Sequence, residues 1–241
     1  ADLATYRTAF TTNQLDVFAA PNVDEAKELL KVRKDAQHLQ DPSFGFLSFW
    51  MNVREKPWDD PRIRRAVRRA VNPQEYIQII GRGDGFWIGP ITYAMRDYAL
   101  PEEEVKRLMP YNPQEAKQLR KAAGYEKLEF EWWHADAAVY TQAYVDTATL
   151  TQAQWKEIGV NVSDRQQPYA QYISTTNQGQ YEGVGHSPRA VPYYMDYLTE
   201  RLYMEPGGKR GRINLSYVNN PQLNNLLDKQ RAEFDSNERK K

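Results

Sequence analysis

Apolar residues are distributed along the chain in two alternating patterns, which together predict strands separated by helices. Residues 44–53, FGFLSFWMNV, form a nearly continuous apolar and aromatic run, which is typical of a strand buried on both faces. Residues 127–134 alternate instead, so that Leu128, Phe130 and Trp132 share one face. Shorter strands are expected at 15–20, 160–166 and 181–187, and the last of these leads into a loop.

Helices are expected where apolar residues recur three or four positions apart between residues that begin and end helices. The clearest, 112–125, has Asn112 as its N-cap, Pro113 in its first turn and Gly124 at its end. Other helices are expected at 3–12, 23–33, 137–157, 168–179, 193–204 and 220–235. Strands that alternate with helices in this way predict a three-layer α/β/α domain with a mixed sheet.

Residues 81–111 interrupt this regular order. The segment carries four glycines, three prolines and several aromatic residues. An irregular segment of this length inside a compact domain is usually functional or mobile. The segment 81–111 is therefore expected to be functional or mobile.

A basic helix is expected at 60–71, with Asp59 or Asp60 as its cap and Pro61 in its first turn. Its apolar positions make one continuous face: Ile63, Ala66, Val67, Ala70 and Val71. The remaining positions are arginines, namely Arg62, Arg64, Arg65, Arg68 and Arg69. A membrane-binding helix would carry Trp, Phe or Leu opposite its charges. We therefore expect a buried apolar stripe and mostly exposed arginines.

Charge and composition exclude several classes of function. Lys and Arg total 32 and Asp and Glu also total 32, whereas nucleic-acid-binding chains usually carry a basic excess. No apolar run of 18 residues is present, so stable membrane insertion is not expected.

Candidate chemistry is sparse. The chain has no cysteine, which excludes disulfides and thiolate metal sites. The three histidines, His38, His134 and His186, lie far apart and in no metal-ligand spacing. Neither a G-x-S-x-G motif nor a phosphate-binding P-loop is present. We therefore expect neither an enzyme nor a metal or cofactor site.

A resemblance to a known family begins at Asn52 and continues through KPWDDPRIRRAVRRAVN. This stretch is similar to the signature of family 5 extracellular solute-binding proteins, the peptide- and nickel-type binding subunits of ABC transporters. The family motif reads approximately as an asparagine, then PF-DD-x-R-x-R-x-A, and ends in A-I-D-R, where this chain has Asn72 and Pro73. Four further stretches resemble the family: NQLDVFAAP, YNPQEAKQLRKAAGY, QWKEIGVNV and INLSYVNNPQLNNLLDKQRAE.

The resemblance implies the second lobe of a type II periplasmic-binding-protein-like fold. Complete members are about twice as long, so a first lobe is expected before residue 1 and a final crossing after residue 241. Residues 1–40 would be a hinge-proximal segment packed on the lobe, and residues 41–241 the lobe itself, a single domain overall. The implied function is extracytoplasmic: binding of a peptide or similar solute between two lobes and delivery to an ABC permease.

The implied ligand site combines the 81–98 region with the loop after strand 181–185. The candidate residues are Phe86, Trp87, Tyr93, His186 and Arg189, and we expect them to converge on one edge of the domain. The aromatic rings either stack on a solute or pack under their own loop. Peptide-binding relatives often place a Trp and an Asp in the second loop, which here reads VGHSPRAVPYYMD.

The arginine in this loop keeps other solutes open, because a guanidinium suits a carboxylate or a phosphate. An oligosaccharide or an anionic solute is therefore the alternative within the same family. From another class, the alternative is a stand-alone domain that interacts through its basic helix.

Overall fold

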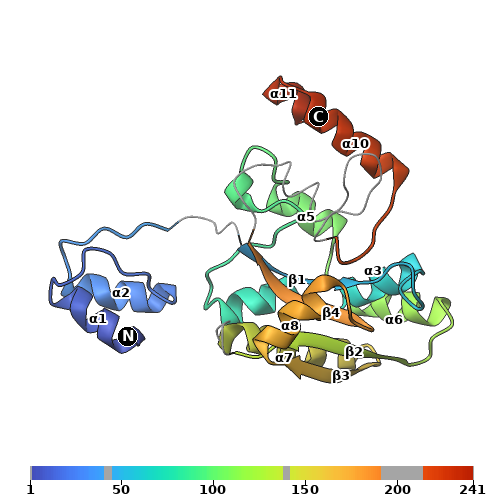
Figure 1. Ribbon diagram of the computed structural model, residues 1–241, viewed down its shortest axis with the longest axis horizontal. Coiled ribbons are helices and arrows are strands. Elements are labelled where there is room, and N and C mark those ends of the chain that lie inside the picture. Colours follow the sequence, from blue (N-terminus) through green and yellow to red (C-terminus); the bar gives the residue numbers. More distant parts are fainter. Residues whose placement is uncertain (1, 41–44, 138–141, 191–213, 241) are drawn as a thin grey trace.

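The structure is a computed structural model that describes residues 2–40, 45–137, 142–190 and 214–240 (Figure 1). The helix predicted at 193–204 lies outside the described residues.

Four strands form one mixed sheet in the order β1-β4-β2-β3 (Figure 1). Their bounds are Gly45–Met51 for β1, Leu128–Ala135 for β2, Val160–Gln167 for β3 and Val184–Ala190 for β4. Strand β2 runs parallel to both β3 and β4, whereas β1 runs antiparallel to β4. The mixed sheet is therefore confirmed.

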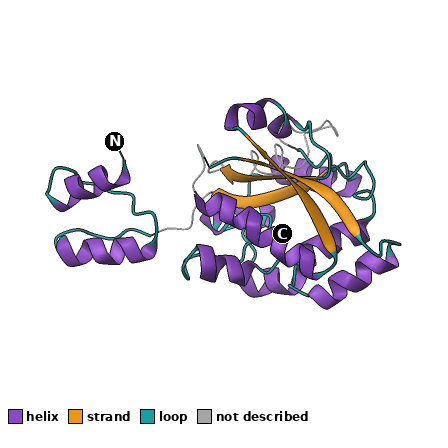
Figure 2. Ribbon diagram, turned by 90° about the horizontal axis from the view of Figure 1, so that it is seen from below, coloured by secondary structure: helices purple, strands orange, loops and turns teal. Residues whose placement is uncertain are grey.

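Helices cover both faces of this sheet (Figure 2). On one face lie α3 (Pro61–Arg69), α6 (Pro113–Ala122) and α7 (Gln142–Glu157), whose apolar side chains meet Leu128 and Trp132 of β2 in the main core. On the other face α8 (Tyr169–Ser174) contributes to a second core with Trp50 and Ala135. These layers confirm the predicted α/β/α arrangement.

The remaining helices are short or peripheral. They are α1 (Leu3–Thr11), α2 (Val23–Val32), α4 (Pro73–Glu75), the π-helix η1 (Tyr76–Ile80), the 3-10 helix η2 (Tyr93–Met95), α5 (Glu102–Leu108), the 3-10 helix η3 (Thr176–Gln178), α10 (Pro221–Ala232) and α11 (Ser236–Arg239). Helices α1 and α2 lie beside the main body, and α10 and α11 lie above it in the same view (Figure 1). The division of the chain at residue 40 stays a prediction.

Predicted helix boundaries hold where a capping side chain defines them. The Asn112 side chain accepts a hydrogen bond from the Glu115 N–H at 3.0 Å, and Asp60 accepts one from the Arg62 N–H at 2.8 Å. After α6 the backbone turns at Gly124, where φ is +92°, a conformation that favours glycine. Local sequence therefore fixes these helix ends.

Two strand predictions need correction. Residues 15–20 form no strand, and the Phe18 ring packs on Phe10 of α1 with centroids 5.8 Å apart. Strand β1 is not buried on both faces, because it lies at the sheet edge and Leu47 is 46% exposed. Its apolar run instead forms the wall of a cavity. Periodicity alone cannot distinguish a strand that lines a cavity from a strand that is buried on both faces.

Two other boundaries differ from the prediction. The last strand begins at Val184 rather than 181 and continues to Ala190, because the chain bends at Gly183, where φ is +72°. The 81–111 segment is irregular only in part, since it contains η2 and α5.

The structure confirms that the apolar stripe of the basic helix is buried, but it contradicts the expectation that the arginines are mostly exposed. All five stripe residues are buried, with Ile63 and Val67 fully so. Arg62 and Arg65 are exposed, but the other three arginines are half-buried. Their guanidinium groups fold back onto the protein, as when Arg64 donates to Trp58 O at 2.5 Å and Arg69 pairs with Glu115 at 2.8 Å. Long arginine stems allow this, since they cover apolar surface while the head finds a partner.

A buried histidine joins β2 to β3. His134 is 2% exposed, and its Nδ1 and Nε2 lie 2.9 Å from Ala135 O and from Asp164 Oδ1. Asp164 also accepts a hydrogen bond from Gln152 of α7 at 2.8 Å. The hydrogen bond from His134 holds the pKa of the Asp164 carboxyl below its ordinary value.

This pair predicts an acid-sensitive component of stability. A carboxyl whose folded pKa is depressed stabilises the fold above its unfolded pKa of about 3.9, and the stabilisation is lost as pH falls through the folded value. Because nearly half of the Asp164 side chain is exposed, we expect at most about 1 kcal/mol. Urea unfolding between pH 3 and 7 should show that Asp164→Asn loses more stability at pH 6 than at pH 3. The exposed Asp228→Asn serves as the control, and an equal loss at both pH values would contradict this account.

Candidate functional site

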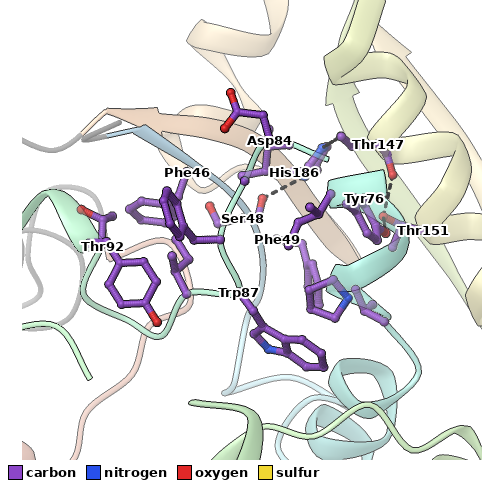
Figure 3. A pocket seen from close by; sticks show the side chains of 18 of the residues that line it. Phe46, Ser48, Phe49, Tyr76, Asp84, Trp87, Thr92, Thr147, Thr151 and His186 are labelled. Carbon is purple, nitrogen blue, oxygen red and sulfur yellow. Dashed lines mark hydrogen bonds between the residues drawn. The ribbon is translucent and has the colours of Figure 1, made fainter. Parts of the chain in front are cut away.

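A cavity of about 760 Å³ opens beside strand β1 (Figure 3). Residues of β1, β4, α3, α7, η1 and the 84–93 loop line it. Sites for small molecules commonly enclose about 300–1,000 Å³. The size alone therefore suits a small organic solute.

One part of the lining is aromatic. Phe46 and Phe49 come from β1, and Phe86, Trp87 and Tyr93 come from the irregular loop. The Phe86 and Tyr93 rings pack edge to face with centroids 5.2 Å apart, and half of Phe86 is exposed. Such rings offer flat apolar surface on which a side chain of a solute can pack.

The opposite part is polar. Figure 3 shows Tyr76, Thr147 and Thr151 together on one side, away from Phe46 and Thr92. Thr151 Oγ1 donates to Thr147 O at 2.7 Å, so it accepts the hydrogen bond from the Tyr76 hydroxyl at 2.6 Å. Burial raises the pKa of Tyr76, which keeps this hydroxyl protonated.

His186 is held rigidly at the floor of the cavity. Its ring is 3% exposed and stacks between Trp132 and Tyr144, with centroids 5.0 and 4.9 Å away. Nδ1 donates to Ser48 O at 2.9 Å, and Nε2 lies 3.1 Å from Thr147 Oγ1. These contacts make His186 a fixed wall residue that joins β4 to β1 and α7.

Four of the five predicted site residues meet at this cavity: Phe86, Trp87, Tyr93 and His186. Their convergence is confirmed, whereas contact with a solute stays a prediction. Arg189 pairs in register with Phe46 on β1, but its side chain lies outside what the structure describes. Its role therefore also stays a prediction.

Several lining residues were missed by sequence reasoning. Arg68 was assigned to the exposed side of its helix, yet it lines the cavity. Thr147 and Thr151 are buried one turn apart on α7. Polar residues repeated on the buried face of a helix were a usable signal, because buried hydroxyl groups need partners.

Three polar atoms in the lining have no hydrogen-bond partner in the described part of the chain. They are Trp87 Nε1, Thr92 Oγ1 and Tyr93 OH. A buried polar group without a partner costs about 1–3 kcal/mol. Polar atoms of a solute or of bound water would therefore find partners on this side of the cavity.

Comparison with known proteins defines the family. Residues 1–208 match the family described as bacterial extracellular solute-binding proteins, family 5 middle region. The chain belongs to this family. The resemblance inferred from the signature at 52–72 is thereby confirmed.

Two curated relatives of this chain are named for the molecules that they bind. The dipeptide-binding protein of Escherichia coli is 27% identical over 180 residues, covering 71% of this chain and 32% of that protein. The glutathione-binding protein of Salmonella typhimurium is 24% identical over 225 residues, covering 87% of this chain and 41% of that protein. The chain thus spans less than half the length of these relatives.

Solved structures share the fold. HbpA2 from Haemophilus parasuis matches with a TM-score of 0.80 at 20% identity, over 99% of this chain and 46% of that one. DppA from Helicobacter pylori, solved with the peptide STSA, matches with a TM-score of 0.72 at 21% identity, over 99% of this chain and 45% of that one. These matches confirm the type II periplasmic-binding-protein fold. Within the described residues, no helix is long and apolar enough to cross a membrane.

Proposed function

We propose that this chain is the solute-binding component of an ABC importer, outside the cytoplasm, and that its solute is a small peptide or a similar molecule. The observation that carries the proposal is the cavity at β1, because it brings predicted site residues from two distant segments together within the family match. The solute would be delivered to a permease, and no chemical step is needed.

The peptide class is supported by what the relatives are named for. Dipeptide and glutathione are both small, flexible and polar at their ends. The chemistry of the cavity lining suits such a molecule, because one wall is aromatic and another carries hydroxyl groups and one arginine. The basic-helix alternative finds less support, because three of the five arginines are half-buried against the protein.

Binding in this proposal involves closure by a further lobe. The chain covers about half of each solved structure. Residues 1–40 would lie on the hinge side, and 41–241 would act as one lobe. Hinge closure of this kind encloses the ligand and supplies the contacts that an open half-site lacks.

Calorimetric titration with a panel of dipeptides and tripeptides tests the proposed function. If the full-length protein binds its solute at about 1 μM, the binding free energy is about −8 kcal/mol. One lobe offers roughly half of the contacts, so this chain alone should bind near −4 kcal/mol, or about 1 mM. Equal micromolar affinity of both forms would contradict the two-lobe account. Absence of binding by the full-length protein to any peptide would contradict the peptide class.

A further inference from the structure

Two arginines of α3, Arg64 and Arg68, donate to main-chain carbonyls and have no carboxylate partner in the described chain, and of the two only Arg68 lines the cavity. Arg62 pairs with Asp60 at 2.6 Å, and Arg69 pairs with Glu115 at 2.8 Å. Arg68 instead donates to two main-chain carbonyls at longer distances, Met109 O at 3.3 Å and Val71 O at 3.4 Å. Within the described chain, no carboxylate lies within ion-pair distance of Arg68.

The Arg68 guanidinium retains hydrogen-bonding capacity. It has five N–H donors, and the described structure uses two of them. The group is half-buried, and burial lowers its pKa while the neighbouring charge of Arg69 acts in the same direction. A cation taken from water without an anionic partner is unfavourable, so the site favours an incoming anion.

The surroundings of Arg68 define what kind of anion fits. Tyr76 lines the same cavity, and its hydroxyl stays neutral because burial raises its pKa. Asp84 also lines the cavity, but it lies on the exposed loop and accepts a hydrogen bond from Gln40 at 2.7 Å. A solute that places a negative group at Arg68 and an apolar group on the aromatic wall therefore matches both parts of the lining.

We propose that Arg68 anchors a carboxylate of the bound solute, so that the site prefers carboxylate-bearing peptides over their amides. An arginine fork can donate two parallel hydrogen bonds to a carboxylate. This inference rests on the proposed function and names the chemistry of its ligand. Position 68 lies outside the two arginine positions of the family signature, Arg62 and Arg64.

The experiment is a thermodynamic cycle on the full-length protein with three probes. They are alanyl-phenylalanine, its C-terminal amide, and glutamyl-phenylalaninamide, whose only carboxylate is on a side chain. Wild-type protein should bind alanyl-phenylalanine about 10- to 100-fold more tightly than the amide, the scale expected for a charge-assisted hydrogen bond. Arg68→Gln should remove this preference and leave affinity for the amide within about threefold.

Matched variants separate anchoring from a structural role. Arg65→Gln makes the same charge change on the same helix at an exposed position, and it should leave all three affinities unchanged. Arg68→Lys keeps the charge but loses the fork, so it should retain part of the preference. If Arg68→Gln does not fold, Arg68→Lys and the wild-type comparison of acid with amide still decide the matter.

The outcomes distinguish this inference from the proposed function. Tight, Arg68-dependent binding of glutamyl-phenylalaninamide would support the anchor and identify a side-chain carboxylate as its ligand. Equal wild-type affinity for the acid and the amide, together with no Arg68-dependent gain for glutamyl-phenylalaninamide, would overturn the anchor while solute binding stands. If Arg68→Gln weakens the binding of the acid and of the amide equally, Arg68 has a structural role and does not bind the carboxylate. If only solutes without a carboxylate bind, the anchor falls, and if no solute binds, the proposed function falls with it.

Discussion

Replacing Trp155 by alanine should lower the free energy of unfolding by about 3–5 kcal/mol, the usual cost of removing a fully buried large aromatic side chain. The indole is 0% exposed and packs edge to face against Phe130 and Trp132, with centroids 5.2 and 4.9 Å away. Its Nε1–H donates to Val67 O of α3 at 2.9 Å. One side chain of α7 thus joins the sheet to α3, and its loss leaves both a void and an unpaired carbonyl.

Urea unfolding measures the effect of Trp155→Ala, with two variants for comparison. Trp155→Phe keeps part of the packing but loses the donor to Val67 O, so it should cost less than alanine. Phe234→Ala removes an aromatic ring that is 93% exposed and should change stability by less than about 0.5 kcal/mol. A loss below about 1 kcal/mol for Trp155→Ala would show that this contact is not central to the core.

The second large effect is expected at Arg120, a buried cation on α6. Its side chain is 4% exposed, donates from Nε to Ile158 O at 3.0 Å and also donates from Nη1 to Tyr125 O. Ile158 follows the end of α7, where main-chain carbonyls lack helical partners and the helix dipole favours a positive charge. Gly159 has φ of +77°, and a Cβ there would lie 3.0 Å from Arg120 Nη2, so glycine leaves room for this contact.

Arg120→Met should destabilise the protein by about 2–3 kcal/mol, because two carbonyls lose a charged donor inside the protein. Desolvating the arginine opposes its hydrogen bonds, and an apolar replacement of a complete buried ion pair can be neutral. In Arg120→Met the two carbonyls remain in place and lose their donor, so we expect a net loss of stability. Lys121→Ala, at the exposed neighbouring position, is the control for changes in helix charge. An unchanged urea midpoint for Arg120→Met would contradict the proposed capping role.

Local signals predicted most elements, since caps and periodic patterns act within a few residues. Asn112 and Gly124 define α6 from sequence alone, and both behave as expected. Strand β1 shows the limit of the method. Its apolar run predicted burial on both faces, but only β4 pairs with it among the described strands, and Leu47 is 46% exposed. Which strand pairs with which depends on the whole fold, so it cannot be predicted from the hydrophobic pattern of one strand.

The candidate site was predictable only on its aromatic side. Phe86, Trp87 and Tyr93 stand out in an irregular loop, whereas Arg68 is one of five arginines on one helix. Arg68 lines the cavity and donates to Met109 O, 41 positions away, and no local pattern reports that contact. The polar wall likewise joins η1 to α7 across 75 positions through Tyr76 and Thr151.

The central claim, that a solute occupies the cavity beside β1, can be tested through the indole N–H signals of the protein. Trp87 is the tryptophan in the lining, and its Nε1 has no partner in the described chain, whereas Trp58 and Trp133 lie elsewhere in the domain. In a titration with alanyl-phenylalanine followed by ¹⁵N NMR, the Trp87 indole signal, assigned with Trp87→Phe, should shift in a saturable manner. The signals of Trp58 and Trp133 should stay in place. A saturable shift confined to Trp58 or Trp133, with Trp87 unchanged, would contradict this assignment of the site.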